Sequence, residues 1–95
     1  MTDKEWSGQI IGGRDYCEVC GKTLVHLAPH HYIYRSQCLA LRHEIRNGIC
    51  ICPECHNKAH KDRKWIGDWM QKNRPADKKF CDNRYLEDNK IGGKL

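Results

Sequence analysis

The chain has 95 residues, of which 31% are charged and 39% hydrophobic, with a formal net charge of +5. That is enough for one small folded domain with a modest core, for which a metal ion would be a useful staple. No apolar run approaches membrane-spanning length, and Met1–Gln9 lacks the shape of a signal peptide, so we expect a cytoplasmic protein without membrane association.

The first half of the chain predicts an arm followed by short strands. Met1–Asp15 has no clear periodicity and is expected to be an arm or a lead-in strand. Thr23–Leu27 is rich in β-branched and aliphatic residues and predicts a strand that Pro29 interrupts, with His31–Tyr34 continuing in extended conformation. Gly48–Ile51 predicts a second strand. In the polar segment between these strands, the expected core anchors are Leu39, Leu41 and Ile45.

The second half predicts three helices. Pro53 suits the first turn of a helix, where its missing N–H costs nothing, and this helix is expected to run through Lys61. Lys64–Asn73 predicts an amphipathic helix that ends before Pro75. Its core face is expected to consist of Trp65, Ile66, Trp69 and Met70. Asp77–Asp88 predicts a third helix, followed by a frayed tail at Ile91–Leu95. The inward residues of the third helix are expected to be Phe80, Tyr85 and Leu86.

The chain contains seven cysteines, and four of them form two C-x-x-C pairs. These four thiolates, Cys17, Cys20, Cys52 and Cys55, suit a closed tetrahedral Zn²⁺ site of the structural type. Without a signal peptide, metal binding is favoured over a disulfide framework. Gly21 gives the first pair the backbone freedom to turn beneath the ion. The remaining cysteines, Cys38, Cys50 and Cys81, are expected to behave as small buried hydrophobic residues.

The positive charge is concentrated in one segment. Residues 57–79 contain eight Lys or Arg and three Asp or Glu, whereas the rest of the chain holds nine of each sign. Such a segment favours contact with a phosphate backbone, although a solvated helical face explains the same charges. The candidate contact residues are Lys58, Lys61, Arg63 and Lys64.

A second metal site is predicted from histidines. His56 and His60 are four residues apart and share one face of the predicted helix, with His30 as their upstream partner. Three imidazoles with vacant positions are typical of a hydrolytic metal, and they suit Zn²⁺, Mn²⁺, Ni²⁺ or Co²⁺ better than Mg²⁺. His31 points to the opposite face of an extended strand and is better suited to act as a general base. On spacing alone, two surface histidines of a helix are the simpler explanation of His56 and His60.

Together, the motifs between Cys17 and His60 resemble the HNH endonucleases, the ββα-metal nuclease family. The matching stretches are HHYIYRS at 30–36, LR at 41–42 and NGICICPECHNKAH at 47–60. The resemblance implies a small α+β fold in which two strands and a helix hold one catalytic metal. A four-cysteine zinc knuckle staples this ββα-metal motif, and C-terminal helices follow. We expect one nuclease domain, with an arm at 1–15, the core at 16–62 and a helical extension at 63–90.

The resemblance also implies a role for individual residues. The family's general base falls on His31, its motif Asn on Asn47 and its final metal ligand on His60. His30 takes a ligand position that is often Asp, and His56 becomes the third ligand, an arrangement similar to that of colicin-type nucleases. Asn47 is expected to pin the loop between the strands. Arg35, four residues past the base, is close enough to a bound phosphate to stabilise its charge.

The implied activity is metal-dependent hydrolysis of double-stranded DNA, by nicking or by double-strand cleavage, in a protein of bacterial or phage origin. It requires a structural Zn²⁺ and one divalent catalytic ion. Because each chain carries one active site, a double-strand cut needs a homodimer or two binding events. The alternative is a non-catalytic zinc module that binds nucleic acid. It accounts for the cysteines and the basic segment, but it gives no role to His30, His31 or His60.

Overall fold

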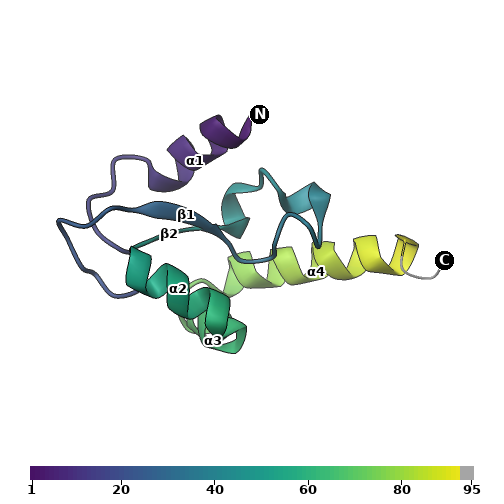
Figure 1. The fold of residues 1–95 in the computed structure, drawn as a ribbon. Helices are drawn as coiled ribbons and strands as arrows, with labels where there is room; N and C mark the ends of the chain where they lie inside the picture. Colours follow the sequence, from purple (N-terminus) through teal and green to yellow (C-terminus); the bar gives the residue numbers. More distant parts are fainter. Residues whose placement is uncertain (93–95) are drawn as a thin grey trace.

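A computed structural model describes the backbone of residues 1–92 and the side chains of residues 1–89. Its elements are α1 (Asp3–Ile11), β1 (Ala28–His31), η1 (Leu39–Leu41), η2 (Ile45–Asn47), β2 (Gly48–Ile51), α2 (Pro53–Lys61), α3 (Arg63–Asn73) and α4 (Pro75–Gly92). The two strands form a hairpin with α1 on one face and α2 and α3 on the other (Figure 1). This is the predicted α+β class, and the two strands followed by α2 form the predicted ββα unit.

The hairpin is antiparallel, with His30 opposite Ile49 and His31 opposite Gly48. The strand predicted at Gly48–Ile51 is confirmed. The strand predicted at Thr23–Leu27 is wrong, because β1 begins only at Ala28 and includes Pro29. A loop precedes β1, and Thr23 makes an isolated bridge to Tyr16. The continuation beyond His31 is also wrong, since the chain turns at Tyr34.

Pro29 is tolerated in β1 because the backbone N–H and carbonyl of its partner in β2, Cys50, point away from β1. The N–H of Cys50 donates to Oε2 of Glu18 at 2.7 Å, and its carbonyl accepts from the N–H of Glu18 at 2.9 Å. Cys50 is therefore bonded on the edge of β2 that faces away from β1. Pro29, opposite Cys50, accordingly sits at a position where no N–H is needed.

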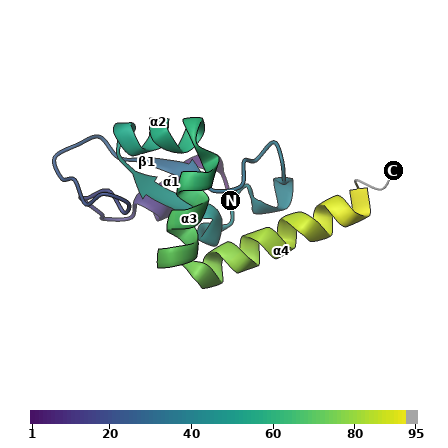
Figure 2. The ribbon, with the colours of Figure 1, turned by 90° about the horizontal axis from the view of Figure 1, so that it is seen from below.

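The three helices after the hairpin form as predicted, with small shifts in their ends. The thiol of Cys52 caps α2 by accepting from the N–H of Cys55, and the carboxylate of Asp62 caps α3 by accepting from the N–H of Trp65. Helix α4 starts at Pro75, runs beside η1 and η2, and extends beyond the rest of the molecule (Figure 2). The tail prediction is wrong for residues 91 and 92, which are helical, and residues 93–95 lie outside the described part of the chain.

The core on the α2–α3 face contains Ile49 and Ile51 from β2 and Ile66 and Met70 from α3. Trp65 and Trp69 are half-buried against it, so the predicted face of α3 is confirmed. A second cluster lies beneath α4, where Cys38, Leu41 and Cys81 are buried with Ile33. Cys50 is buried in a third cluster beneath α1, so all three remaining cysteines are buried as expected.

Three predicted core anchors are wrong. Leu39 is 75% exposed and Leu86 is 62% exposed, and Ile45 is also exposed. Each of the turns η1 and η2 is three residues long and directs one side chain inward, Leu41 and Asn47 respectively. On α4 the inward position belongs to Cys81, flanked by the half-buried Phe80 and Tyr85.

The N-terminal segment is a helix rather than an arm or strand. Thr2 and Glu5 form a capping box: the Thr2 hydroxyl accepts from the N–H of Glu5, whose carboxylate accepts from the N–H of Thr2. Trp6 and Ile10, one turn apart, are buried against the hairpin. None of the helices described is long and apolar enough to cross a membrane.

Candidate metal centres and active site

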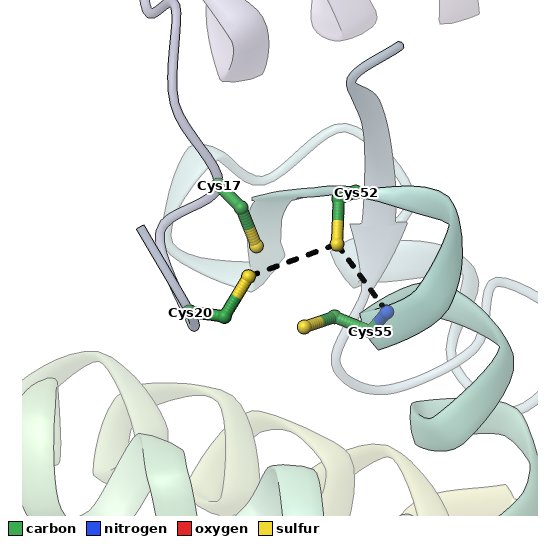
Figure 3. A group of neighbouring side chains, drawn as sticks. All are labelled: Cys17, Cys20, Cys52 and Cys55. Carbon is green, nitrogen blue, oxygen red and sulfur yellow. Dashed lines mark hydrogen bonds between the residues drawn. The ribbon is translucent and has the colours of Figure 1, made fainter. Parts of the chain in front are cut away.

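The four paired cysteines converge on one point. Cys17 and Cys20 come from the loop before β1, and Cys52 and Cys55 come from the start of α2 (Figure 3). All four sulfurs lie within 4.8 Å of one another, and Sγ of Cys20 is 3.8 Å from Sγ of Cys52. Sulfurs bound at about 2.3 Å to a tetrahedral zinc are themselves about 3.8 Å apart. The donor set therefore fits Zn²⁺ in type, number and spacing.

Backbone groups prepare this cluster for a cation. Burial alone would raise the pKa of the Cys17 thiol, but nearby backbone N–H groups lower it to about 7. Gly21, whose φ is +78°, lets the chain reverse so that its N–H donates to the carbonyl of Cys17 at 2.9 Å. Burial and the neighbouring thiols raise the pKa of Cys55, as expected where four such groups gather without a cation.

The three predicted histidine ligands also come together. His30 extends from β1 toward α2, where His56 and His60 lie one turn apart. Their ring centroids are 4.8–5.0 Å apart, and one nitrogen of each lies within 4.8 Å of the others. His30 is 2% exposed, and burial together with the two neighbouring imidazoles lowers its pKa to about 3. Burial also lowers the pKa of His56. Neutral imidazoles at this spacing fit a divalent cation.

Tyr34 orients one of these rings. Its hydroxyl lies 2.8 Å from Nδ1 of His60. An imidazole that donates its Nδ1–H to the hydroxyl oxygen has the lone pair of Nε2 free for a metal. Tyr34 and the three histidines line a cleft of about 320 Å³, together with His31, Arg35 and neighbouring residues. A substrate in this cleft would therefore meet the histidine cluster directly.

His31 lies in the same cleft but faces the other side of the hairpin. Its Nε2 is 2.8 Å from the carbonyl oxygen of Arg42, and its ring stacks on Trp6 with 4.1 Å between centroids and 12° between planes. Burial lowers its pKa, so the ring is neutral near pH 7. Because a carbonyl can only accept, Nε2 carries the hydrogen and Nδ1 has the free lone pair.

Asn47 is fully buried and joins three segments of backbone. Its Oδ1 accepts from the N–H of Ile33 at 2.8 Å, and its Nδ2 donates to the carbonyls of Ile33 at 2.9 Å and Leu41 at 3.1 Å. These bonds fix the connection between the strands, directly after His31. Asn47 is thus placed to act through the loop rather than on a substrate.

Arg35 and Arg42 share one carboxylate. Nη1 of Arg35 is 3.4 Å from Asp3, and Arg42 donates to the same carboxylate through Nε at 2.9 Å and Nη2 at 2.6 Å. His43 adds a third contact at 2.7 Å. The hydrogen bonds from Arg42 and His43 hold the pKa of Asp3 well below its usual range. Two arginines, Arg35 and Arg42, therefore lie near His31, and the carboxylate of Asp3 pairs with both.

The four candidate phosphate-contacting residues lie on α2 and the start of α3. The guanidinium of Arg63 stacks over the ring of Tyr34 at 4.2 Å, next to the histidine cluster. Lys58 lies over the ring of Trp65 at 4.6 Å, Lys61 is exposed, and Lys64 pairs with Asp68 at 2.9 Å. Arg63 thus contacts Tyr34, a residue of the cleft, whereas the charge of Lys64 is already partly balanced. Their contact with nucleic acid stays a prediction.

Sequence reasoning missed the contributions of Asp3, Trp6 and Tyr34. The signal for the first two was present: Thr2 and Glu5 have the spacing of a capping box, and Trp6 and Ile10 have helical spacing. Tyr34 gave no such signal, because its contact with His60 joins positions 26 residues apart.

Comparison with known proteins gives one match. A family model described as HNH endonuclease matches residues 17–62. No curated protein and no solved structure matches the chain. The matched segment contains both metal-ligand clusters, His31 and Asn47, but none of α1, α3 or α4.

Proposed function

Because residues 17–62 belong to the HNH endonuclease family, we propose that this protein is a metal-dependent endonuclease that hydrolyses phosphodiester bonds of double-stranded DNA. The observation that carries the proposal is the pairing of His31 with the histidine cluster. A neutral imidazole with a free Nδ1 shares one open cleft with three histidines whose ring nitrogens are gathered at metal-binding distance.

In the proposed reaction, Nδ1 of His31 takes a proton from a water molecule, whose oxygen forms a bond to phosphorus. The bond between phosphorus and the 3′ oxygen breaks, and the leaving oxygen takes a proton from solvent, which gives a 5′ phosphate and a 3′ hydroxyl. His30, His56 and His60 would hold a divalent ion, which when bound would supply a Lewis acid for the charge on the phosphate and the leaving oxygen. Neutral nitrogen donors suit Zn²⁺, Mn²⁺, Ni²⁺ or Co²⁺ better than Mg²⁺.

The remaining residues of the cleft have supporting roles in this proposal. Arg35 binds the phosphate oxygens, for which its guanidinium must exchange the long contact with Asp3 for a stronger one. Asn47 keeps the loop after His31 in place through its three backbone bonds. Arg63 contacts the DNA backbone on the α2–α3 side of the cleft. Asn47 is thus a positioning residue, while His31 and Arg35 touch the reactants.

The two histidine roles can be separated by mutation. His31→Ala removes the base but no ligand, so cleavage of supercoiled plasmid should fall by about 10²–10⁴-fold while Mn²⁺ affinity measured by calorimetry is unchanged. His60→Ala removes a ligand, so both cleavage and Mn²⁺ affinity should fall, with partial recovery at high Mn²⁺. His26→Ala, at an exposed position outside the cleft, is the matched control.

If His31→Ala loses Mn²⁺ binding and His30→Ala keeps it, the two adjacent roles have been assigned the wrong way round. If all of these variants cleave like the wild type, or the wild type binds DNA without cleaving it under any divalent ion, the nuclease proposal is wrong. The protein would then be a binding module.

A further inference from the structure

Helix α1 lies outside the segment that matches the HNH family, yet it contacts the proposed base. We propose that Trp6 is a positioning residue for His31, and that α1 thereby completes the active site. This inference rests on the proposed function, because it assigns Trp6 a role in the reaction of His31.

The first step is the contact itself. One face of the His31 ring is covered by the indole of Trp6, nearly parallel to it at 4.1 Å, and the edge of the ring is held by the carbonyl of Arg42 at 2.8 Å. A stacked face prevents the ring from tilting, and a hydrogen bond in the ring plane prevents it from turning over. Together the two contacts aim Nδ1 in one direction.

The second step is that Trp6 is itself fixed. It is 2% exposed, and its Nε1 donates to the carbonyl of Glu44 at 2.9 Å. The room it occupies exists because β2 begins with Gly48: a Cβ there would lie 2.9 Å from Cζ2 of Trp6 and 2.2 Å from Cδ1 of Ile10. Gly48 is also the residue opposite His31 in the hairpin. The indole of Trp6 therefore packs against Gly48, the cross-strand partner of His31.

The third step is that α1 also holds the second contact of His31. Arg42, whose carbonyl accepts from His31, is bound through its guanidinium by Asp3 in the first turn of α1. Both groups that constrain the base are thus attached to one helix. The capping box at Thr2 and Glu5 stabilises the same turn of α1 and so keeps Asp3 and Trp6 in register.

The inference predicts a selective defect. Trp6→Met removes the flat ring but keeps a large apolar side chain, and should lower kcat for plasmid cleavage by about 10- to 100-fold, since small misplacements of a catalytic group have effects of that order. KM and Mn²⁺ affinity should stay within about twofold of wild type, because the ring on which Trp6 stacks is that of His31, which is not one of the three clustered histidines. Trp6→Phe retains an aromatic face and should recover most of kcat.

A second readout does not depend on activity. The ¹⁵N shifts of the His31 ring in zinc-loaded protein should show one neutral tautomer, with hydrogen on Nε2, in the wild type and in Trp6→Phe. In Trp6→Met they should show a mixture of the two tautomers. Trp69→Leu, half-buried on α3, is the control for general destabilisation and should leave both kcat and the His31 signals unchanged.

The inference is overturned if Trp6→Met keeps wild-type kcat, if it loses no more than Trp69→Leu, or if Trp6→Phe is as impaired as Trp6→Met. Where Trp6→Met fails to fold, the wild-type spectrum decides: a His31 ring that exchanges between tautomers contradicts the proposed clamp. Failure of the proposed function is a different outcome: the wild type would then not cleave DNA, or His31→Ala would cleave it like the wild type, while the tautomer readout would still test the clamp.

Discussion

At the scale of single residues, the proposed site depends on two adjacent histidines that face opposite sides of one strand. His30 points toward α2, where it is buried with two other imidazoles, and His31 points toward α1, where it meets Trp6. Alternation along a strand produces this separation without any special geometry. A neutral base and a cation-binding ligand can therefore be neighbours in sequence without competing for the same ion.

Substitution of Asn47 tests how much this one buried side chain contributes to the stability of the loop that follows His31. Asn47→Ala leaves the N–H and the carbonyl of Ile33 without partners in a buried loop, whereas the carbonyl of Leu41 keeps a bond from the N–H of Glu44 at 3.3 Å. Each unsatisfied buried group costs about 1–3 kcal/mol, so the free energy of unfolding should fall by about 2 kcal/mol or more. Urea unfolding of zinc-loaded protein measures it. A loss below about 1 kcal/mol would mean that water replaces the amide in the loop.

At the scale of elements, the hairpin is covered by helices on both faces, and different interactions attach the helices of each face. Helix α2 follows β2 directly and is fixed by the cysteine cluster at its first turn. Helix α1 docks through Trp6 and Ile10, which are buried in the third core cluster, and through the contacts of Asp3 with Arg42 and His43. The docking of α1 therefore depends on the lack of a side chain at Gly48.

Two glycines give a matched pair for this docking. Gly48→Ala places a Cβ within 2.9 Å of both Trp6 and Ile10 and should destabilise the protein by about 1–3 kcal/mol. Gly8→Ala lies on the exposed side of α1 with nothing within 4 Å and should stabilise the protein by about 0.5–1 kcal/mol. Thermal or urea unfolding of both variants gives the two values. Equal effects of the same sign would show that α1 does not pack on the hairpin in this way.

The junction of α2 and α3 provides the second test at this scale. Arg63→Glu and Lys72→Glu change the net charge equally, but Arg63 lies beside the cleft at the start of α3 and Lys72 lies at its far end. Arg63→Glu should weaken DNA binding for all sequences and reduce the slope of log affinity against log salt by ~1 for each phosphate that the protein no longer neutralises. Lys72→Glu should change the slope much less. If the two variants behave alike, the effect comes from net charge and not from a defined phosphate-binding position.

At the scale of the whole molecule, the cysteine cluster joins the loop before β1 to the start of α2. Most of the ββα unit therefore lies between its two halves, and Arg74 ties the α3–α4 corner to β2 by donating to the carbonyl of Gly48 at 2.8 Å. A chain of this size has a small core, so a bound zinc would contribute a large share of the folding free energy.

Loss of one thiolate tests this contribution. Cys52→Ser should abolish stoichiometric zinc binding and leave the domain unfolded or strongly destabilised, because binding energy at such a site is folding energy. Circular dichroism, together with zinc analysis, measures both effects. His60→Ala is the control, since it removes a metal-binding side chain at an exposed position and should keep the fold. A zinc-free Cys52→Ser protein with a wild-type melting temperature would show that the four cysteines are not a structural zinc site.

The sequence by itself determined what depends on local spacing. Four patterns depend only on residues close together in the sequence: the C-x-x-C pairs, the i, i+4 histidines of α2, the amphipathic face of α3 and the short apolar strand β2. Each of them forms as predicted. The α+β class was implied by the resemblance to the HNH endonucleases, and the two-stranded sheet with its helices confirms it. Whether the clustered histidines bind a catalytic ion, and whether His31 acts as the base, remain predictions.

Only the tertiary structure decided which elements meet around His31. The contacts of Trp6 with His31, of Asp3 with Arg42 and of Tyr34 with His60 join positions 25, 39 and 26 residues apart, and no periodicity predicts such pairs. Likewise Leu39 and Leu86 are as apolar as Leu41, yet they are exposed, because short turns and a projecting helix leave them without a surface to pack on. Side-chain type fixes what a residue can bury, and the packing of distant elements fixes whether it does.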